Sequence, residues 1–112
     1  MPLYTEHIIK IIRHPESQLK YYGKAVTLTV CVSGAGRLCY QWKKDGVNIV
    51  DDGSNNEPEA LNFKGAKSPN LFIQSYTPDY NGSYTCAISN EFDKVETNSA
   101  ELGGLFFCMI TM

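Results

Sequence analysis

Three residues constrain the fold of this chain more than any others: Trp42, Tyr84 and Cys86. Tyr84 precedes Cys86 by two positions, and Trp42 lies 44 positions before Cys86. Side chains two positions apart on a β-strand point to the same face, so Tyr84, Cys86 and Ile88 form one apolar strand face. Trp42 ends a second such face, which begins at Leu38. Faces with this period predict a β-protein rather than a helical one.

The rest of the chain repeats this alternation of apolar and polar residues, and no segment has the period of a helix. Turn-forming residues interrupt it; Asp45-Gly46, for example, suits the positive φ angles of a tight hairpin. Short strands at this spacing indicate a sandwich of two sheets. The expected strands cover residues 7–13, 18–22, 26–32, 38–43, 47–50, 61–64, 70–75, 84–88 and 95–102.

The length of 112 residues is that of a single domain. We expect the folded domain to cover 7–102, with an N-terminal extension over 1–6 and an apolar C-terminal tail over 103–112. The apolar run at 105–112 has only eight residues, far fewer than the roughly 20 that span a bilayer. Membrane contact is therefore expected only if this tail begins a transmembrane helix.

Charge and motif content argue against several function classes. The net charge is −2, and no block of basic residues is present, which disfavours nucleic acid as a partner. The sequence contains no G-x-S-x-G, no Cys/His pairing signal and no phosphate-binding glycine loop. We therefore expect no catalytic residue, no small-molecule substrate and no cofactor. No two cysteines have CxxC spacing, so no metal site is expected either.

The register of segment 26–32 decides whether Cys31 can pair with Cys86. One face of this segment carries four aliphatic residues, Val26, Leu28, Val30 and Val32. Turning Cys31 inward would expose all four, at a cost of roughly 1.5–3 kcal/mol each, whereas one disulfide contributes about 2–4 kcal/mol. We expect Cys31 to face outward and Cys86 to be a buried free thiol. A β-bulge that brings the two cysteines together is the alternative.

The compartment follows in part from these cysteines. Free thiols favour a reducing compartment, and the first thirty residues contain no signal peptide, so the cytoplasm is favoured. An extracellular or cell-surface location is the alternative. Asn81-Gly82-Ser83 is a glycosylation sequon, which would place a glycan on Asn81 in a secreted protein. The same residues also suit a turn.

These patterns together resemble the immunoglobulin superfamily, in its I-set or C2 branch, over residues 8–102. The residues that carry the resemblance are Pro15-Glu16-Ser17, Gly23, Gly34, the run Tyr40-Gln41-Trp42-Lys43-Lys44-Asp45-Gly46, and Gly82-x-Tyr84-x-Cys86. The resemblance implies an all-β, two-sheet antiparallel Greek-key sandwich of seven to eight strands. The chain is also loosely similar to the intracellular immunoglobulin modules of paracaspase-type signalling scaffolds.

The resemblance also implies roles for single residues. Trp42 is expected to fill the centre of the core, and the hydroxyl of Tyr84 to bond back to the backbone at a corner. Val30 stands twelve positions before Trp42, where the family commonly has its first cysteine. Tyr80 stands where the family has an aspartate, which puts the usual buried Asp–Arg pair in doubt. The expected core residues are Val30, Trp42, Leu71, Ile73, Tyr84 and Cys86.

The function that the resemblance implies is protein–protein interaction, without catalysis, as a module of a larger signalling or adhesion protein. The expected partner face combines outward residues of three strands with an aromatic residue at a turn: Gln41, Lys43, Thr85, Ala87, Ser89 and Phe92. One alternative is an extracellular adhesion or receptor domain with a disulfide from Cys31 to Cys86. Another is a structural spacer in a chain of several such domains, although the apolar tail is unlike the polar linkers expected there.

Overall fold

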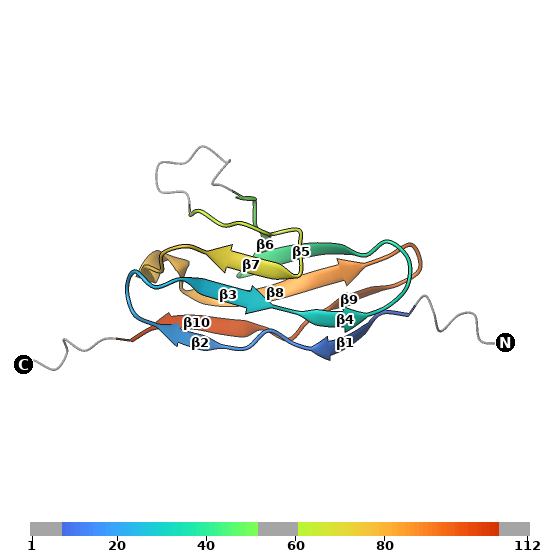
Figure 1. Cartoon of the computed structure of the whole chain (residues 1–112), viewed down its shortest axis with the longest axis horizontal. Coiled ribbons are helices and arrows are strands. Elements are labelled where there is room, and N and C mark those ends of the chain that lie inside the picture. Colours follow the sequence, from blue (N-terminus) through green and yellow to red (C-terminus); the bar gives the residue numbers. More distant parts are fainter. Residues whose placement is uncertain (1–7, 52–60, 106–112) are drawn as a thin grey trace, which may run out of the picture.

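The computed structural model describes residues 8–51 and 61–105, which form a sandwich of two packed layers (Figure 1). One layer contains two antiparallel pairs: β1 (Lys10–Arg13) with β4 (Cys31–Ser33), and β3 (Val26–Thr29) with β7 (Asn70–Ile73). The other is a larger sheet in the order β2 (Gln18–Lys20), β10 (Ala100–Gly104), β8 (Gly82–Ser89), β5 (Cys39–Lys44) and β6 (Val47–Asn48), with β9 (Lys94–Glu96) also on β8. The all-β sandwich expected from the sequence is confirmed.

Most pairings are antiparallel, but β2 runs parallel to β10. The N-terminal segment contributes one strand to each layer: β1 pairs with β4 in the smaller layer, and β2 pairs with β10 in the larger sheet. His14 and Pro15 separate the two strands, because proline cannot donate a ladder hydrogen bond. The Nδ1 atom of His14 accepts a 3.0 Å hydrogen bond from the backbone N–H of Asn98, which holds this crossing against the second sheet.

The expected strand 26–32 is divided in two, because its two halves pair with different partners. β3 pairs with β7, whereas β4 pairs with β1. Val30 lies between them, and its N–H donates to the carbonyl of Pro69 at 3.0 Å instead of to a strand. The division keeps the side-chain register: Val30 is only 2% exposed, and Cys31 is exposed. The prediction that Cys31 faces outward is therefore confirmed.

Other expected boundaries are wrong in detail. Segment 61–64 forms no strand and contributes one isolated bridge, from Lys64 to Phe72. Segment 95–102 is divided into β9 and β10, because the side-chain hydroxyl of Thr97 replaces a backbone partner for the N–H of Cys86. A short 3₁₀ helix, η3 (Pro78–Tyr80), follows β7 and was not expected. Residues 1–7, 52–60 and 106–112 are outside the described part, so the N-terminal extension and most of the apolar tail remain predictions.

The core lies between the layers and is built around aromatic side chains. Trp42 is fully buried, and its indole N–H donates to the carbonyl of Ser68 at 2.8 Å. The six residues expected in the core, namely Val30, Trp42, Leu71, Ile73, Tyr84 and Cys86, are all buried. The side chain of Phe63, from the segment expected as a strand, meets the rings of Tyr80 and Tyr84 edge-on at 5.4 and 6.2 Å.

The hairpin between β5 and β6 turns at Asp45 and Gly46, as expected, with φ angles of 50° and 83°. The carboxylate of Asp45 also accepts a 3.0 Å hydrogen bond from the N–H of Ser83. This bond and a second from neighbouring Lys44 lower the pKa of the Asp45 carboxyl. A charged Asp45 thus ties the hairpin to the start of β8. None of the helices in the described residues is long and apolar enough to cross a membrane.

Candidate functional site

The outward face of β5, β8 and β9 brings together most of the residues predicted for partner binding. The ladder sets Gln41 opposite Ala87 and Lys43 opposite Thr85, and Ser89 lies one step further along β8. All five side chains are partly exposed. This is the face away from the viewer in Figure 1, because β3 lies in front of β8 there. We call the surface formed by these five residues the β5–β8 face.

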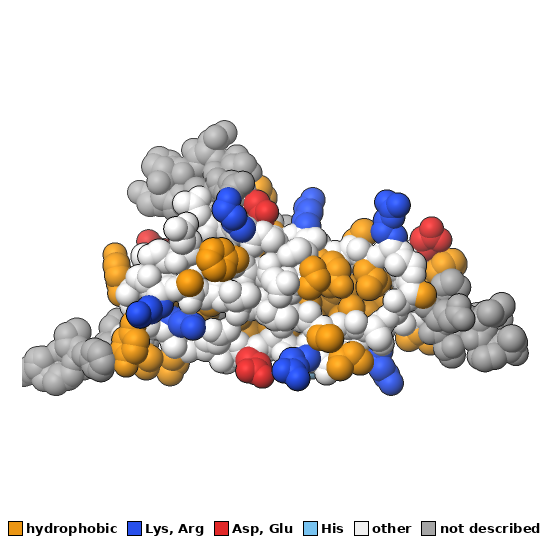
Figure 2. Space-filling model, viewed as in Figure 1, with side chains coloured by type: hydrophobic (Ala, Val, Ile, Leu, Met, Phe, Trp, Pro, Cys, Tyr) orange, Lys and Arg blue, Asp and Glu red, His pale blue; other side chains and the backbone are white. Residues whose placement is uncertain are grey.

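The opposite layer offers no comparable candidate surface. Figure 2 shows it from the β3 and β7 side, where lysine and arginine side chains are spread around the rim and apolar side chains form small separate groups. Scattered apolar side chains of this kind are normal on protein surfaces. They therefore give no reason to prefer this layer as a binding surface.

One half of the β5–β8 face carries an ordered polar cluster. The hydroxyl of Thr85 donates to the Glu96 carboxylate at 2.9 Å, and the Lys43 ammonium lies 3.8 Å from the same oxygen. The Lys43 and Glu96 side chains are 28% and 46% exposed, so the ion pair itself contributes little to stability. Its effect is to give this part of the face a fixed arrangement of one positive and one negative group.

Gln41 has a role that the sequence did not reveal. Its side-chain amide donates to the carbonyls of Trp42 at 2.8 Å and Ile49 at 3.1 Å. The backbone N–H of Trp42 donates to the carbonyl of Ala66 and not to that of Ile49, which follows the end of β6 at Asn48. The Gln41 amide therefore supplies a missing partner where β6 ends, and it is less available to a binding protein than its position suggested.

Phe92 lies in the turn between β8 and β9 and is 65% exposed. The turn is held by the Asn90 side chain, whose oxygen accepts hydrogen bonds from the N–H groups of Phe92 and Asp93 at 2.8 and 2.7 Å. The Asn90 amide nitrogen donates to the carbonyl of Ala35, in the turn beside it. Phe92 is thus presented on a braced turn, at the border of a small hollow that Arg37 also lines.

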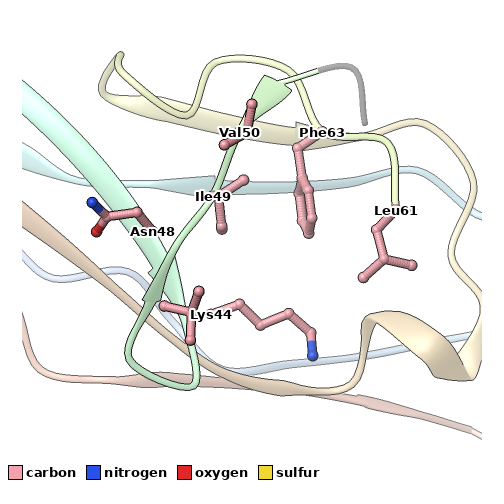
Figure 3. Close-up of a pocket in the computed structure, with 7 residues that line it drawn as sticks. Lys44, Asn48, Ile49, Val50, Leu61 and Phe63 are labelled. Atoms are coloured by element: carbon pink, nitrogen blue, oxygen red, sulfur yellow. The ribbon is translucent and has the colours of Figure 1, made fainter. Parts of the chain in front are cut away.

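A second hollow opens at the β6 edge of the sandwich, with a volume of about 200 Å³. Figure 3 shows Phe63 and Leu61 on one side and Ile49 and Val50 on the other, with the stem of Lys44 beneath them. Its lining is mainly apolar, and no cluster of titratable side chains points into it. Nothing in the described residues shows what covers this hollow.

The cysteines separate into two kinds. Cys31 and Cys39 are exposed free thiols, and Cys86 is a buried one. Burial raises the pKa of the Cys86 thiol to about 12, so it is neutral and unreactive in the folded domain. Cys39 lies on the same side of β5 as Gln41, opposite Ser89. No group of three potential metal ligands occurs among the residues that the structure describes.

Sequence reasoning missed the contribution of β9 to this face. Glu96 lies opposite Ala87, and Lys94 lies opposite Ser89, so two charged side chains border the small residues of β8. The register could have been derived from the turn at 90–93, since the length of a hairpin loop fixes which residues face each other. A single strand over 95–102, as the sequence predicts, leaves Lys94 outside the sheet, whereas the structure places it in β9.

Comparison with known proteins gives a consistent result. A family profile described as the immunoglobulin I-set domain matches residues 9–102. HEPACAM family member 2 of Mus musculus is 34% identical over 88 residues, which are 76% of this chain but 17% of that protein. The chain therefore spans about a sixth of the length of this relative.

Solved structures give the same fold. Tandem Ig repeats of Dlar superpose with a TM-score of 0.70 at 18% identity, covering 87% of this chain and 48% of theirs. A complex of titin M10 with an obscurin-like 1 Ig domain gives 0.67 at 22% identity, covering 87% of this chain and 93% of that one. At such low identity these likenesses concern the fold alone.

Proposed function

The chain belongs to the immunoglobulin I-set family, and from this premise we propose that it is a non-catalytic protein-binding module of a larger adhesion or signalling protein. The proposed contact surface is the β5–β8 face, extended by Phe92 at one end and by Glu96 at its side. A fold of this kind hosts many functions, so the proposal depends on the surface rather than on the fold.

The observation that supports this surface most strongly is the position of Phe92. Phe92 is 65% exposed, and the Asn90 hydrogen bonds already hold its turn, so the backbone of the turn loses little conformational freedom on binding. Aromatic residues, phenylalanine among them, are enriched in protein interfaces relative to the rest of the surface. The small side chains of Thr85, Ala87 and Ser89 would allow a partner to approach the sheet beside it closely.

The proposal can be tested with immunoglobulin domains as probes, because one structural neighbour is a complex between two such domains. Binding of the chain would be measured by biolayer interferometry against the matched segment of HEPACAM family member 2, the Ig repeats of Dlar and titin M10. We expect at least one of these probes to bind. Ala87→Arg, at the centre of the face, and Phe92→Ala should each weaken that binding about tenfold or more.

Thr27→Arg is the matched control, because Thr27 is exposed on β3 in the opposite layer. It should bind as the unchanged chain does. Thermal unfolding of each variant would verify that the domain is folded. Equal binding by the chain and both face variants, or no binding to any probe, would contradict the proposal.

A second function, that of a structural spacer, is favoured by where the chain enters and leaves the sandwich. The described chain begins beside β1 and ends after β10, at the opposite end of the layers (Figure 1). A domain of this shape extends a tandem chain by its own length. The test is force spectroscopy on a tandem of copies: with Cys31, Cys39 and Cys86 free, each copy should release about 3.4 Å per unfolded residue over its whole folded length. A much shorter release would contradict it.

A further inference from the structure

β9 is an edge strand with an open side. It pairs with β8 along Glu96, Val95 and Lys94, and no strand of the described residues pairs with its other side. Open edges present unpaired backbone groups that can hydrogen-bond to another chain, and proteins often place charged residues there to prevent it. β9 carries two such residues, but they have opposite signs.

The direction of the backbone groups on this edge follows from one hydrogen bond. The N–H of Thr97 donates to the carbonyl of Cys86 at 3.0 Å, so Thr97 and, two positions earlier, Val95 direct their backbone groups toward β8. In an antiparallel ladder these groups alternate from residue to residue. The N–H and C=O groups of Lys94 and Glu96 therefore point away from β8, to the open side.

The side chains of Lys94 and Glu96 lie two residues apart and so share the outward face of the sheet. If a second β9 lies antiparallel to the first, about a two-fold axis at Val95, then Lys94 of each copy is opposite Glu96 of the other. Opposite charges facing each other across a pair of strands are stabilising, and like charges are destabilising. The edge is thus complementary to itself in one register, which is what a two-fold symmetric interface needs.

We propose that this edge joins two copies of the chain, with β9 pairing antiparallel to β9 of a second copy in the Lys94–Glu96 register. The pairing would continue the β8–β9 sheet from one copy into the other. The Glu96 N–H donates to the Lys94 carbonyl of the other copy, and symmetry provides the bond twice. The Lys94 N–H already donates to the Asp93 carboxylate at 2.9 Å, so it adds no bond unless it changes partner.

Two backbone hydrogen bonds and two ion pairs make a small contact. The dissociation constant of the isolated chain should therefore be on the order of 0.1–1 mM. Such an affinity becomes effective when several copies are held together in one larger molecule or on one surface, because the effective local concentration is then in the millimolar range. The expected dimer is weakened by salt, because its ion pairs are exposed.

Charge reversal tests both the contact and its register. Sedimentation equilibrium at low ionic strength would give the dissociation constant of the chain and its variants. Lys94→Glu places two glutamates opposite each other and should weaken dimerisation about tenfold, and Glu96→Lys should do the same with two lysines. The double variant Lys94→Glu, Glu96→Lys restores opposite charges at both positions and should recover the dimer. Lys10→Glu, on exposed β1, is the matched control and should have no effect.

Glu96 also contacts Lys43 within one copy, so Glu96→Lys alone could act through that pair. Lys94→Glu leaves the Lys43–Glu96 pair unchanged. Recovery of the dimer in the double variant would require a contact between residue 94 of one copy and residue 96 of the other. A second measurement is amide hydrogen exchange, in which the Glu96 N–H should exchange more slowly as concentration rises. A chain that stays monomeric up to about 1 mM, or a dimer unchanged by both reversals, would overturn the proposal.

This contact does not depend on the function proposed above. Phe92→Ala should weaken probe binding about tenfold and leave the dimer intact, because Phe92 lies in the turn before β9 and has no place in the Lys94–Glu96 register. Lys94→Glu should have the reverse effect. The two variants therefore separate failure of the binding face from failure of the edge contact.

Discussion

The hydroxyl of Tyr84 donates a 2.5 Å hydrogen bond to the backbone carbonyl of Tyr80. The bond closes the corner between η3 and β8, as the resemblance predicted for Tyr84. Tyr80 also replaces the aspartate common in the family. Its ring packs edge-on against Phe63, and its hydroxyl accepts a 2.9 Å hydrogen bond from the N–H of Asn62. At the position where the resemblance implies the aspartate of a buried Asp–Arg pair, this chain therefore has an aromatic contact between Tyr80 and Phe63.

Removing the Tyr84 hydroxyl should destabilise the domain. Tyr84→Phe keeps the ring in the core but leaves the Tyr80 carbonyl without this buried donor, so we expect a loss of about 1–2 kcal/mol in the free energy of unfolding. Urea denaturation measures it. Tyr22→Phe removes a hydroxyl from a residue that is 75% exposed and should change stability by less than about 0.5 kcal/mol. Equal effects of the two substitutions would show that the corner bond contributes nothing.

Restoring a cysteine at position 30 should create a disulfide. Val30 and Cys86 both belong to the buried core, and Val30 stands where the family commonly has its first cysteine. After oxidation, Val30→Cys should be about 2–4 kcal/mol more stable than the same variant when reduced. Mass spectrometry of the unreduced variant would locate the bond. A bond from Cys31 to Cys86 in the unchanged chain would contradict the register observed here.

The three described cysteines should react at different rates with an alkylating reagent. Cys31 and Cys39 are exposed and should be labelled in the folded domain, whereas Cys86 is buried and should react only after unfolding. Mass spectrometry of peptides after timed labelling measures each rate. Labelling of Cys86 in the folded protein as fast as that of Cys39 would contradict its burial.

The buried thiol should also make stability depend on pH in alkaline solution. Burial raises the pKa of Cys86 from about 9 to about 12, so above pH 9 the unfolded chain releases a proton that the folded chain retains. This contribution to stability is complete below pH 9 and is lost as the pH rises toward 12. Burial also raises the pKa of Tyr84, which acts in the same direction.

Cys86→Ala isolates the contribution of the thiol. The variant should be less stable near neutral pH, and its stability should fall less between pH 9 and 12 than that of the unchanged chain. The Tyr84 contribution is present in both proteins and cancels in the difference. Parallel stability curves over this range would contradict a raised pKa for Cys86.

Asn81 should accept a glycan when the chain is expressed through a mammalian secretory pathway. Asn81 is exposed, and its side-chain oxygen accepts a hydrogen bond from the hydroxyl of Tyr76. A glycan on the amide nitrogen leaves this oxygen in place, so modification costs the fold no hydrogen bond. Digestion with peptide N-glycosidase should lower the mass. Ser83→Ala should abolish the shift and Ser83→Thr should keep it; an unmodified Asn81 would contradict the prediction.

Alternation along each strand determined much of the fold in advance. It predicted correctly that Val30 is buried and Cys31 is exposed, because moving a strand by one residue would exchange its buried and exposed faces. The hairpin at Asp45 and Gly46 followed from local conformational preference in the same way. These are local properties, and the sequence contains them directly.

Pairing between distant segments was decided only in the folded chain. Three features depend on which distant segments pair or pack together. They are the division of strand 26–32 at Val30, the absence of a strand at 61–64, and the hydrogen bond from the Gln41 amide to the Ile49 carbonyl. The candidate binding face was predicted in part, as outward positions on single strands. The sequence by itself determined which side chains are apolar and which face of each strand they share. The tertiary structure alone decided that, among the described strands, none pairs with the side of β9 that faces away from β8, because an open edge depends on how distant segments are arranged.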